Sequence, residues 1–491
     1  MLFSMFAATA AKFPSRAAIV EPDCELTYLQ LETLASAIAS TLQKQSITAG
    51  DRVILLLPNC AQFVAATFAI SKLGAVIVPL NLAYKADELL FYFEDAQAKA
   101  AVTFGSAASV IEDVTSRLST PCMLINLDDI NLLTANESLP ISTAVDPAAT
   151  ALYQYSTGST GKPKRVMRSF GDLVSEAENF RNTAKTTEDD KILAVAPFFH
   201  AHGFGNGVLA AAASGASLVT LTSFTRRKAV MSVLKKHAIT IFPGVPFMFS
   251  ILAEAPSIDR EPLPALRLAF SAGAALDEET YQRFLQKYGV PIRQLYGSTE
   301  TGAMCLNTGA TTGDLWRSVG RPLHNVSIEI AGEDGMLGPN ENGEIVVRSN
   351  AMTSGYANLA EATKESFRGD QFWTGDLGYL DEGGHLFITG RKKFFINAAG
   401  NKVDPAEIEN LIAEHPKVKE VVVVGVESSY GLEVIKAVVV LKEPCNEQDI
   451  RDCCLGRVAD FKVPRIVEFR TEIPKSPLGK VLRKYLIEQP A

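Results

Sequence analysis

The sequence predicts an α/β protein. We expect a large N-terminal domain of parallel-sheet subdomains with a small antiparallel β subdomain, followed by a small, mobile α/β C-terminal domain. Short apolar runs alternate with helical segments through much of the chain, a pattern typical of parallel strands covered on both faces. From about Leu337 to Phe387 the pattern changes to glycine-rich, alternating strands. With 491 residues the chain exceeds the usual size of one hydrophobic core, so we expect at least two domains.

The elements of the first domain follow from their apolar patterns. Residues 1–11 are apolar but have no basic segment in front of them, which favours a helix packed on its own domain over a signal peptide. The next elements alternate between buried strands and a helix of regular apolar periodicity. We predict strands at 52–57, 75–80, 191–197, 216–221 and 266–271, and a helix at 59–73.

Residues 192–225 carry no formally charged side chain, which raises the question of a membrane span. A helix crosses a bilayer with about 20 apolar residues. However, Pro197, His200, His202 and Asn206 interrupt this stretch, together with repeated Gly, Ser and Thr. We therefore expect a buried strand, a polar loop and an alanine-rich helix, and no transmembrane segment.

The second domain is predicted to begin at residue 391, which gives domains of 1–390 and 391–491. Asp404 is a good N-cap, Pro405 suits the first helical position, and acidic residues follow in the first turn, so a helix should run to about Glu414. The remaining elements form a compact α/β unit of about 100 residues. They are strands near 420–425, 434–441 and 466–469 and a helix from about 447.

The composition excludes several classes of protein. Hydrophobic residues make up 47% and charged residues 21%, as in an ordinary soluble globular protein. A net charge of -8 disfavours a nucleic-acid binder. Seven scattered cysteines without a C-x-x-C motif favour reduced thiols and a cytoplasmic location over a disulfide framework or a zinc site.

The segment from Tyr155 to Met167 combines two glycines, four hydroxyls and three basic side chains. Backbone N–H groups and cations in such a loop can surround a polyphosphate. The Walker A pattern does not fit, because Ser156 replaces its first glycine and Pro163 replaces its magnesium-binding hydroxyl. Taken alone, the segment could also be an ordinary Ser/Gly loop.

Further segments offer groups that suit a nucleotide. The segment from Gln294 to Gly302 is expected just after a strand. In it, Tyr296 has a flat face for a purine, Thr299 has a hydroxyl for a phosphate, and Glu300 has a hard oxygen ligand for Mg²⁺. Residues 270–275 end a strand in small residues, which permits close approach to a flat ligand. Between Trp373 and Gly378, Asp376 could accept both ribose hydroxyls.

Two more segments, at 388–409 and 474–483, complete the set; the last one is a loop that carries Lys480. Five of these motifs follow one another in an order that resembles the adenylate-forming superfamily, namely those at 155–167, 294–302, 373–378, 388–409 and 474–483. That superfamily contains acyl- and aryl-CoA synthetases, adenylation domains of peptide synthetases, and luciferases. The resemblance covers essentially the whole chain, and the motifs are closest in character to those of acyl- or aryl-CoA ligases.

The resemblance implies a binding site for ATP and Mg²⁺. The loop from Thr157 to Lys162 would hold the β- and γ-phosphates, Ala274, Ala275 and Tyr296 would line the adenine site, and Glu300 would bind the metal. Asp376 and Arg391 would contact the ribose. The full nucleotide set is Ser156, Thr157, Gly158, Ser159, Thr160, Gly161, Lys162, Gly273, Ala274, Ala275, Tyr296, Gly297, Thr299, Asp376 and Arg391.

The resemblance also assigns catalytic roles. Lys480 would bridge the attacking carboxylate and the α-phosphate, and His200 would lie near the acyl carboxylate, although a polar cap on the core is an alternative for His200. Thr157 and Glu300 complete the catalytic set, while His202 is left as structural. Lys393 would be the hinge about which the small domain rotates, and Gly400 would then line a tunnel for the pantetheine arm.

The substrate is expected to be an acid without an α-amino group. Amino-acid-activating relatives typically place an Asp in the segment that corresponds to Phe199–Gly203, and Ala201 stands there in this chain. No Asp or Glu occurs between Asp190 and Glu254, and burying an unpaired ammonium costs several kcal/mol. A fatty or aryl acid fits the predicted pocket residues, which are mostly apolar. For Phe247 and Met248, core packing is an equally good interpretation. The pocket set is Phe247, Met248, Leu295, Ala303 and Met304.

The expected reaction is formation of an acyl-adenylate with release of pyrophosphate, followed by acyl transfer to a phosphopantetheine thiol. Coenzyme A is the family's commonest acceptor, and an acyl carrier protein is the runner-up. A luciferase-type oxidation would use the same motifs. An inactive sensor of acyl-adenylates or nucleotides is the alternative from another class, against which the intact Glu300, Asp376 and Lys480 argue.

Overall fold

The computed structural model describes residues 1–129, 145–156, 163–221, 224, 227–254, 261–309, 313–391, 396–398, 400–428, 432–474, 481 and 483–487. The chain divides into two compact units. Unit 1 comprises Met1–Leu82, Phe93–Gln154 and Arg165–Arg391, and unit 2 comprises Ala83–Tyr92, Tyr155–Lys164 and Lys392–Ala491. The assignment of domains to 1–390 and 391–491 stays a prediction.

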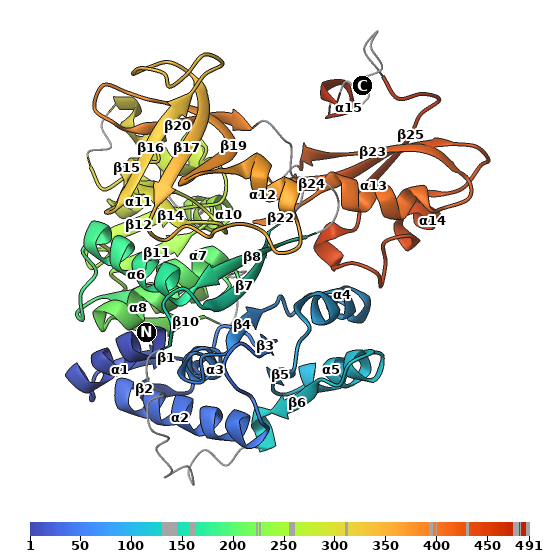
Figure 1. Cartoon of the computed structure of the whole chain (residues 1–491). Helices are drawn as coiled ribbons and strands as arrows, with labels where there is room; N and C mark the ends of the chain where they lie inside the picture. The colour runs from blue at the N-terminus through green and yellow to red at the C-terminus, as the bar shows by residue number, and fades with distance from the viewer. Residues whose placement is uncertain are drawn as a thin grey trace. The chain divides into compact units, whose positions relative to one another are not determined.

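A nine-stranded sheet forms the centre of unit 1 (Figure 1). Strands β1, β10, β9, β11, β12 and β13 run parallel, as their apolar runs predict. The remaining strands pair antiparallel at the two edges of the sheet. The strand order is β15 (Arg321–Pro322), β14 (Gly302–Leu306), β13 (Ile292–Ser298), β12 (Leu268–Ser271), β11 (Ile241–Gly244), β9 (Lys191–Ala194), β10 (Ser217–Thr220), β1 (Ala17–Val20) and β2 (Glu25–Thr27).

A second sheet has six strands, and its pairs β3–β4, β3–β5, β4–β7 and β5–β6 are parallel. It shares one buried core with the larger sheet, in which Phe63 packs against Phe198 with ring centroids 5.4 Å apart. The strand order is β6 (Met123–Asn126), β5 (Ala100–Thr103), β3 (Arg52–Leu55), β4 (Val76–Pro79), β7 (Thr150–Ser156) and β8 (Lys164–Ser169).

Helices separate these strands, as the alternating pattern predicts. The first one, α1 (Leu2–Lys12), buries Leu2, Phe3 and Phe6 and stacks Phe6 on Phe68 of α3, which confirms a helix packed on its own domain. The other α-helices up to residue 366 are α2 (Tyr28–Lys44), α3 (Ala61–Lys72), α4 (Ala86–Ala96), α5 (Ala107–Ser116), α6 (Phe170–Ala184), α7 (Ala201–Gly203), α8 (Ala210–Ser214), α9 (Arg227–Lys236), α10 (Pro246–Ala253), α11 (Glu278–Tyr288) and α12 (Ala360–Ser366).

The predicted antiparallel subdomain is present and is larger than the pattern from Leu337 to Phe387 indicates. It begins at Val326 and ends at Arg391, because its first strand is not glycine-rich and its last strand runs past the apolar residues. All pairs in this five-stranded sheet are antiparallel. The strands are β16 (Val326–Ala331), β17 (Gly343–Ser349), β19 (Gln371–Leu380), β18 (Phe367–Arg368) and β20 (Leu386–Arg391).

Unit 2 contains a mixed sheet with its own buried core. Asp404 caps α13 (Pro405–Ala413) by accepting the Ala406 N–H at 2.8 Å, and Pro405 occupies the first helical position, so this predicted helix start is confirmed. The sheet order is β22 (Asn401–Val403), β21 (Ile396–Ala398), β24 (Glu433–Leu441) and β23 (Val418–Glu427), with β25 (Ile466–Phe469) paired to β24, and the other helices are α14 (Glu447–Asp452) and α15 (Lys484–Ile487).

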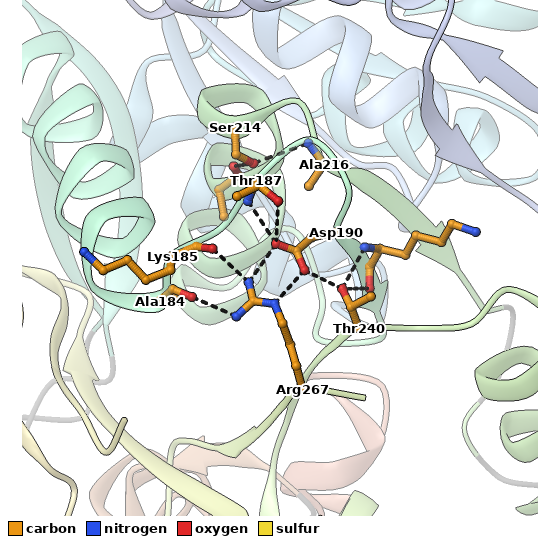
Figure 2. A network of polar contacts seen from close by, with 10 residues as sticks. Ala184, Lys185, Thr187, Asp190, Ser214, Ala216, Thr240 and Arg267 are labelled. Atoms are coloured by element: carbon orange, nitrogen blue, oxygen red, sulfur yellow. Dashed lines mark hydrogen bonds and ion pairs between the residues drawn. The ribbon is translucent and has the colours of Figure 1, made fainter. Parts of the chain in front are cut away.

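A network of polar contacts ties together the amino ends of three parallel strands of the large sheet (Figure 2). Asp190, Thr240 and Arg267 directly precede β9, β11 and β12. Arg267 pairs with both oxygens of Asp190 at 2.7 and 2.8 Å, and Thr240 donates to the same carboxylate at 2.7 Å. Arg267 also donates to the Ala184 and Lys185 carbonyls, which completes the C-terminus of α6. This network therefore fixes the end of the sheet opposite to the one that carries the candidate site.

Among the described residues, no helix combines the length and the apolar character that crossing a membrane requires.

Candidate active site at the carboxyl ends of the large sheet

Four neighbouring parallel strands bring most of the predicted site segments to one edge of the sheet. Strands β9, β11, β12 and β13 end at Ala194, Gly244, Ser271 and Ser298. The segments that follow carry His200, the Phe247–Met248 pair, residues 273–275 and Glu300, in that order. Because the carboxyl ends of parallel strands open on the same side, these segments converge there, as ligand-binding loops do in open α/β sheets.

The predicted ribose-binding residues Asp376 and Arg391 contact each other, and Tyr296 of the predicted adenine site contacts Asp376. Tyr296 donates its hydroxyl to Asp376 at 2.6 Å, and the Arg391 guanidinium pairs with the other Asp376 oxygen at 2.6 Å. Burial raises the pKa of the Tyr296 phenol far above its usual value, and the adjacent Asp376 charge raises it further. The phenol therefore stays protonated and keeps Asp376 in place, with a second lone pair on each carboxylate oxygen available to a ligand hydroxyl.

Glu300 lies in the tight turn between β13 and β14. Strand β13 continues through the motif to Ser298 and β14 begins at Gly302, so the segment from Gln294 to Gly302 is mostly a hairpin and not a loop after a strand. Glu300 is only 8% exposed and accepts the Tyr356 hydroxyl at 2.9 Å. Its backbone carbonyl accepts the Thr353 N–H at 2.8 Å. The Tyr356 hydroxyl thus orients the Glu300 carboxylate, and the Thr353 N–H fixes the backbone of the same residue, before any ligand arrives.

The turn after β12, where the adenine site is predicted, is open to solvent. Gly273 has φ of +87°, a conformation that favours glycine, and no atom lies near the position of a Cβ there. Ala274 and Ala275 are exposed beside it. Gly297 has another role, since a Cβ there would overlap the Gly302 carbonyl of β14. Thr299 is half-buried in the hairpin turn.

The segment after β9 places two histidines differently. His200 is exposed, precedes the short helix α7, and accepts the His202 N–H through Nδ1 at 3.5 Å. Residues Phe204–Leu209 then form a π-helix, a feature that often marks functional sites. Asn206 of this π-helix donates its amide to Nδ1 of His202 at 2.9 Å.

The predicted pocket residues divide into two groups. Phe247 and Met248 are half-buried on α10, next to the carboxyl end of β11. Leu295, Ala303 and Met304 are buried. Ala303 packs in the core of the large sheet, whereas Met304 points to the opposite face of β14 into the core of the antiparallel subdomain. The pocket assignment stays a prediction, and Ala303 and Met304 cannot line it from the same face of their strand.

Several predicted residues lie outside the described part of the chain. They are Thr157, Gly158, Ser159, Thr160, Gly161, Lys162, Lys393 and Lys480. Ser156 is the last residue of β7. Gly400 lies in unit 2, in the turn between β21 and β22, with φ of +89° and its N–H donated to Asn397 Oδ1 at 2.9 Å. The roles of these residues remain predictions.

The sequence interpretation missed a buried ion pair next to the site. Arg168 pairs with Glu176 at 3.0 Å, and their side chains are 1% and 4% exposed. Burial raises the pKa of Glu176, and the Arg168 charge opposes that rise. A Cβ at Gly205 of the π-helix or at Gly302 of β14 would overlap the Glu176 carboxyl group, so both glycines make room for it. The only sequence signal was the presence of glycines where Glu176 packs, which cannot be interpreted without the fold.

Comparison with known proteins decides the family. Residues 6–357 match the family described as AMP-binding enzyme, and residues 407–480 match the AMP-binding enzyme C-terminal domain. The chain belongs to the AMP-binding enzyme family. It is an adenylate-forming enzyme of the AMP-forming acid–thiol ligase type, and the predicted family and fold class are confirmed.

Relatives match nearly the whole chain. An oxalate–CoA ligase from Arabidopsis thaliana is 33% identical over 98% of this chain and 96% of its own length. A long-chain-fatty-acid–CoA ligase from Mycobacterium tuberculosis is 31% identical over 97% of this chain and 96% of its own. A solved structure of a double mutant of o-succinylbenzoate CoA synthetase from Bacillus subtilis matches with a TM-score of 0.88 and 28% identity, and covers 98% of both chains.

Proposed function

We propose that this AMP-binding enzyme activates a carboxylic acid with ATP and transfers the acyl group to coenzyme A. The observation that carries the proposal is the convergence of Glu300 and of the Tyr296–Asp376–Arg391 contacts at one edge of the large sheet. Relatives named for joining a carboxylic acid to CoA support the choice of acceptor. An acyl carrier protein remains the second candidate acceptor.

The residues at this edge fit a nucleotide with a magnesium ion. The Asp376–Arg391 pair suits the ribose, and Glu300 offers one oriented carboxylate for the metal. Within the described residues no three His, Cys, Asp or Glu side chains gather as an independent metal site. That suits Mg²⁺, which is usually held by one or two carboxylates together with substrate phosphates and water. The ion would supply neutralisation of phosphate charge.

The proposed reaction has two steps, and neither step needs an oxidant or a reductant. First, a carboxylate oxygen attacks the α-phosphorus of ATP, and the bond to the bridging oxygen breaks to release pyrophosphate. Next, the thiol sulfur attacks the acyl carbon, AMP leaves with the carboxyl oxygen, and the thiol proton passes to solvent. Two anions meet in the first step, so positioning and charge neutralisation by the loop cations and Lys480 should carry the catalysis.

The substrate class is proposed to be fatty or aryl acids without an α-amino group. Ala201 leaves no carboxylate in the segment after β9. Glu176 is a carboxylate that reaches this region from α6, but its charge is already paired with Arg168. Since a second cation would have to displace a buried guanidinium, Glu176 does not change the proposal.

Carboxylate-dependent ATP–pyrophosphate exchange tests the proposal. The panel would contain straight-chain fatty acids, benzoic and cinnamic acids, and amino acids. We expect exchange with a fatty or aryl class, and exchange with amino acids alone would contradict the substrate argument. Release of a CoA thioester, compared with loading of a carrier protein, then identifies the acceptor.

The Lys480→Ala variant separates an enzyme from an inactive nucleotide sensor. Removing one charge-stabilising group should lower the exchange rate by about 10²–10³-fold. ATP binding, measured by calorimetry, should persist in the variant. A wild-type protein that binds ATP but shows no exchange across the panel would favour the sensor.

A further inference from the structure

The segment between β17 and α12 contacts elements of two different sheets within unit 1. On one side it lies along β8, the last strand of the six-stranded sheet. Ala357 donates its N–H to the Arg165 carbonyl of β8 at 3.0 Å. Tyr356 forms an antiparallel bridge with Val166 of the same strand. On the other side the segment bonds to Glu300, in the turn between β13 and β14 of the large sheet.

Thr353 makes both connections by itself. It is completely buried, with 0% of its surface exposed. Its hydroxyl donates to the Met167 carbonyl of β8, while its backbone N–H donates to the Glu300 carbonyl at 2.8 Å. The same hydroxyl oxygen accepts the Gly355 N–H at 3.3 Å. A shift of the turn relative to β8 would break one of these bonds, so Thr353 fixes the Glu300 backbone with respect to that strand.

Tyr356 holds the side chain of the same glutamate. Its hydroxyl donates to Glu300 Oε1 at 2.9 Å. Burial raises the pKa of the Tyr356 phenol well above its usual value, and the Glu300 charge raises it further, so the hydroxyl remains a donor. Its ring lies edge-on to Phe367 at 5.6 Å, and its N–H is bonded to Thr363 Oγ1 at 3.0 Å. The backbone and the carboxylate of Glu300 therefore have separate supports from one segment.

β8 also contacts the turn by a second route. Arg168 of β8 pairs with Glu176 at 3.0 Å. A Cβ at Gly302, two residues after Glu300, would overlap the Glu176 carboxyl group, so this group lies directly against the end of the turn. Two independent sets of contacts thus connect β8 to the turn that carries Glu300.

A magnesium ligand needs such support more than an ordinary turn does. Mg²⁺ requires near-ideal octahedral geometry with ligands at about 2.0–2.1 Å, and binding groups must be held within about 0.5 Å of the productive position. Partners that orient a ligating carboxylate therefore contribute to metal affinity. Because Glu300 is the one carboxylate proposed for the metal, its position decides how much the protein adds to the binding of the ion.

We infer that Thr353 is a positioning residue for metal binding. By joining β8 to the turn, and together with Tyr356, it holds the Glu300 carboxylate where that group binds the Mg²⁺ of the nucleotide. The inference rests on the proposed function and adds two supporting residues to its metal site. A role in stability alone would make the hydroxyl at position 353 important for folding but not for the affinity of the folded protein for Mg·ATP.

Calorimetry measures the contribution of the metal without catalysis. The Kd of ATP would be determined in EDTA and in saturating Mg²⁺, with no carboxylic acid present, and the ratio of the two values gives the metal contribution. Thr353→Val keeps the volume and the backbone N–H but removes the hydroxyl. We expect it to lower the ratio by about 10-fold relative to the wild type, the low end for a partner of a metal ligand. Thr353→Ser keeps the hydroxyl and should restore the ratio.

A double-mutant cycle identifies the group through which Thr353 acts. Glu300→Gln should lower the ratio at least as much as Thr353→Val. In the Glu300→Gln background Thr353→Val should have no further effect, because substitutions that act through one group are not additive. Tyr356→Phe removes the other support and should also lower the ratio, by less than Glu300→Gln. It provides the test if Thr353→Val does not fold, which thermal unfolding of each variant establishes.

A matched control comes from the opposite end of the large sheet. Thr240→Val also removes a buried threonine hydroxyl that donates a hydrogen bond, and it should lower stability but leave the ratio unchanged. Absence of pyrophosphate exchange with every acid would overturn the proposed function, whatever the ratio. An unchanged ratio in folded Thr353→Val, in Tyr356→Phe or in Glu300→Gln would overturn the inference. So would a ratio that Thr353→Ser fails to restore, or a Thr353→Val effect that is the same with and without Glu300.

Discussion

The two ends of the large parallel sheet use buried polar groups in opposite ways. At the amino end, both oxygens of Asp190 and all three guanidinium nitrogens of Arg267 have partners (Figure 2). At the carboxyl end, Asn206 Oδ1 and Ser271 Oγ, at the end of β12, have no hydrogen-bond partner in the described structure. A completed network contributes stability, whereas an incomplete one leaves polar groups that can still bond to water or to a ligand. The following predictions examine that difference.

The difference between the two ends of the sheet would not hold if the Glu300 carboxylate had only a structural role. Glu300→Gln keeps an oxygen for the Tyr356 hydroxyl but removes the charge that would hold Mg²⁺. We expect exchange activity to fall by about 10²–10³-fold, as when one preorganised charge-stabilising group is lost. The urea concentration at the midpoint of unfolding should change little in this variant.

Tyr356→Phe is the matched control for Glu300→Gln. It removes the hydrogen bond at 2.9 Å but keeps the carboxylate and its charge. Its activity loss should therefore be much smaller than that of Glu300→Gln. Equal losses would mean that Glu300 acts by fixing the hairpin rather than by its charge.

At the amino end of the sheet, Asp190→Ala should lower the stability of the protein and leave its activity nearly unchanged. It breaks an ion pair in which Asp190 is 5% exposed, together with hydrogen bonds from Thr240 and the Thr187 N–H. We expect the free energy of unfolding to fall by about 2–4 kcal/mol, towards the lower part of the range for buried pairs because Arg267 is 39% exposed and can be rehydrated. Urea denaturation measures this loss. The kcat/KM of the protein that remains folded should be close to that of the wild type, and a loss comparable to that of Glu300→Gln would erase the distinction between the two ends.

Much of this architecture could be predicted from local patterns. The parallel strands follow from their apolar runs, and the cap at Asp404 follows from three adjacent residues. The convergence of the site loops at one edge follows from parallel topology and motif order. What local patterns cannot give are contacts set by tertiary packing. Tyr356 reaches Glu300 across 56 positions, and Glu176 needs both Gly205 and Gly302 to make room for it.

The motif containing Glu300 shows a second limit of prediction from local sequence patterns. Its small and polar residues predict a loop after a strand, yet β13 continues through Ser298 because β14 returns alongside it. Pairing between strands outweighs local propensity here. In the same way, the interrupted stretch after β9 predicts a polar loop, but the structure places a π-helix there, with Asn206 turned towards His202. The ligand-facing geometry of a site is thus harder to predict than the strands that carry it.

The two ends should also respond to acid in different pH ranges. The pKa of His202 falls to about 4 because of burial and then the His200 charge, while an unfolded histidine titrates near 6.5. Between about pH 6.5 and 4 the unfolded state therefore binds a proton that the folded state does not, so stability decreases as the pH falls through this window. Unfolding in urea at successive pH values should show a flatter profile there for His202→Phe than for the wild type. An unchanged profile would mean that the imidazole is already charged in the fold.

Asp190 affects the stability of the protein in a lower pH range than His202 does. Burial works to raise its pKa, but the hydrogen bonds from Arg267, Thr240 and Thr187 and the Arg267 charge bring it below the ordinary value. Its contribution is therefore complete above the unfolded value of about 3.9 and is lost as the pH falls through the lower folded value. The stability difference between wild type and Asp190→Asn should stay constant from pH 7 to about 5 and shrink only in stronger acid. A difference that already declines at pH 6 would show that another group controls this end.

The variant that should change the free energy of unfolding least is the most informative for comparing the two ends of the sheet. Replacing both members of the carboxyl-end pair, in His202→Phe combined with Asn206→Leu, removes the hydrogen bond between them, the contact of the His202 ring with the Gly244 backbone, and the unbonded Asn206 Oδ1. Exchange of such a pair for apolar groups of similar shape is close to neutral, so the free energy of unfolding should change by less than about 1 kcal/mol or increase. Thr240→Val, which leaves the Lys191 N–H and a buried oxygen of Asp190 with fewer partners, should instead lose about 1–2 kcal/mol. If the double variant lost as much stability as Thr240→Val, the pair would be a structural element like its counterpart. If it lost none, the pair would not contribute to stability in the way that its counterpart at the amino end does.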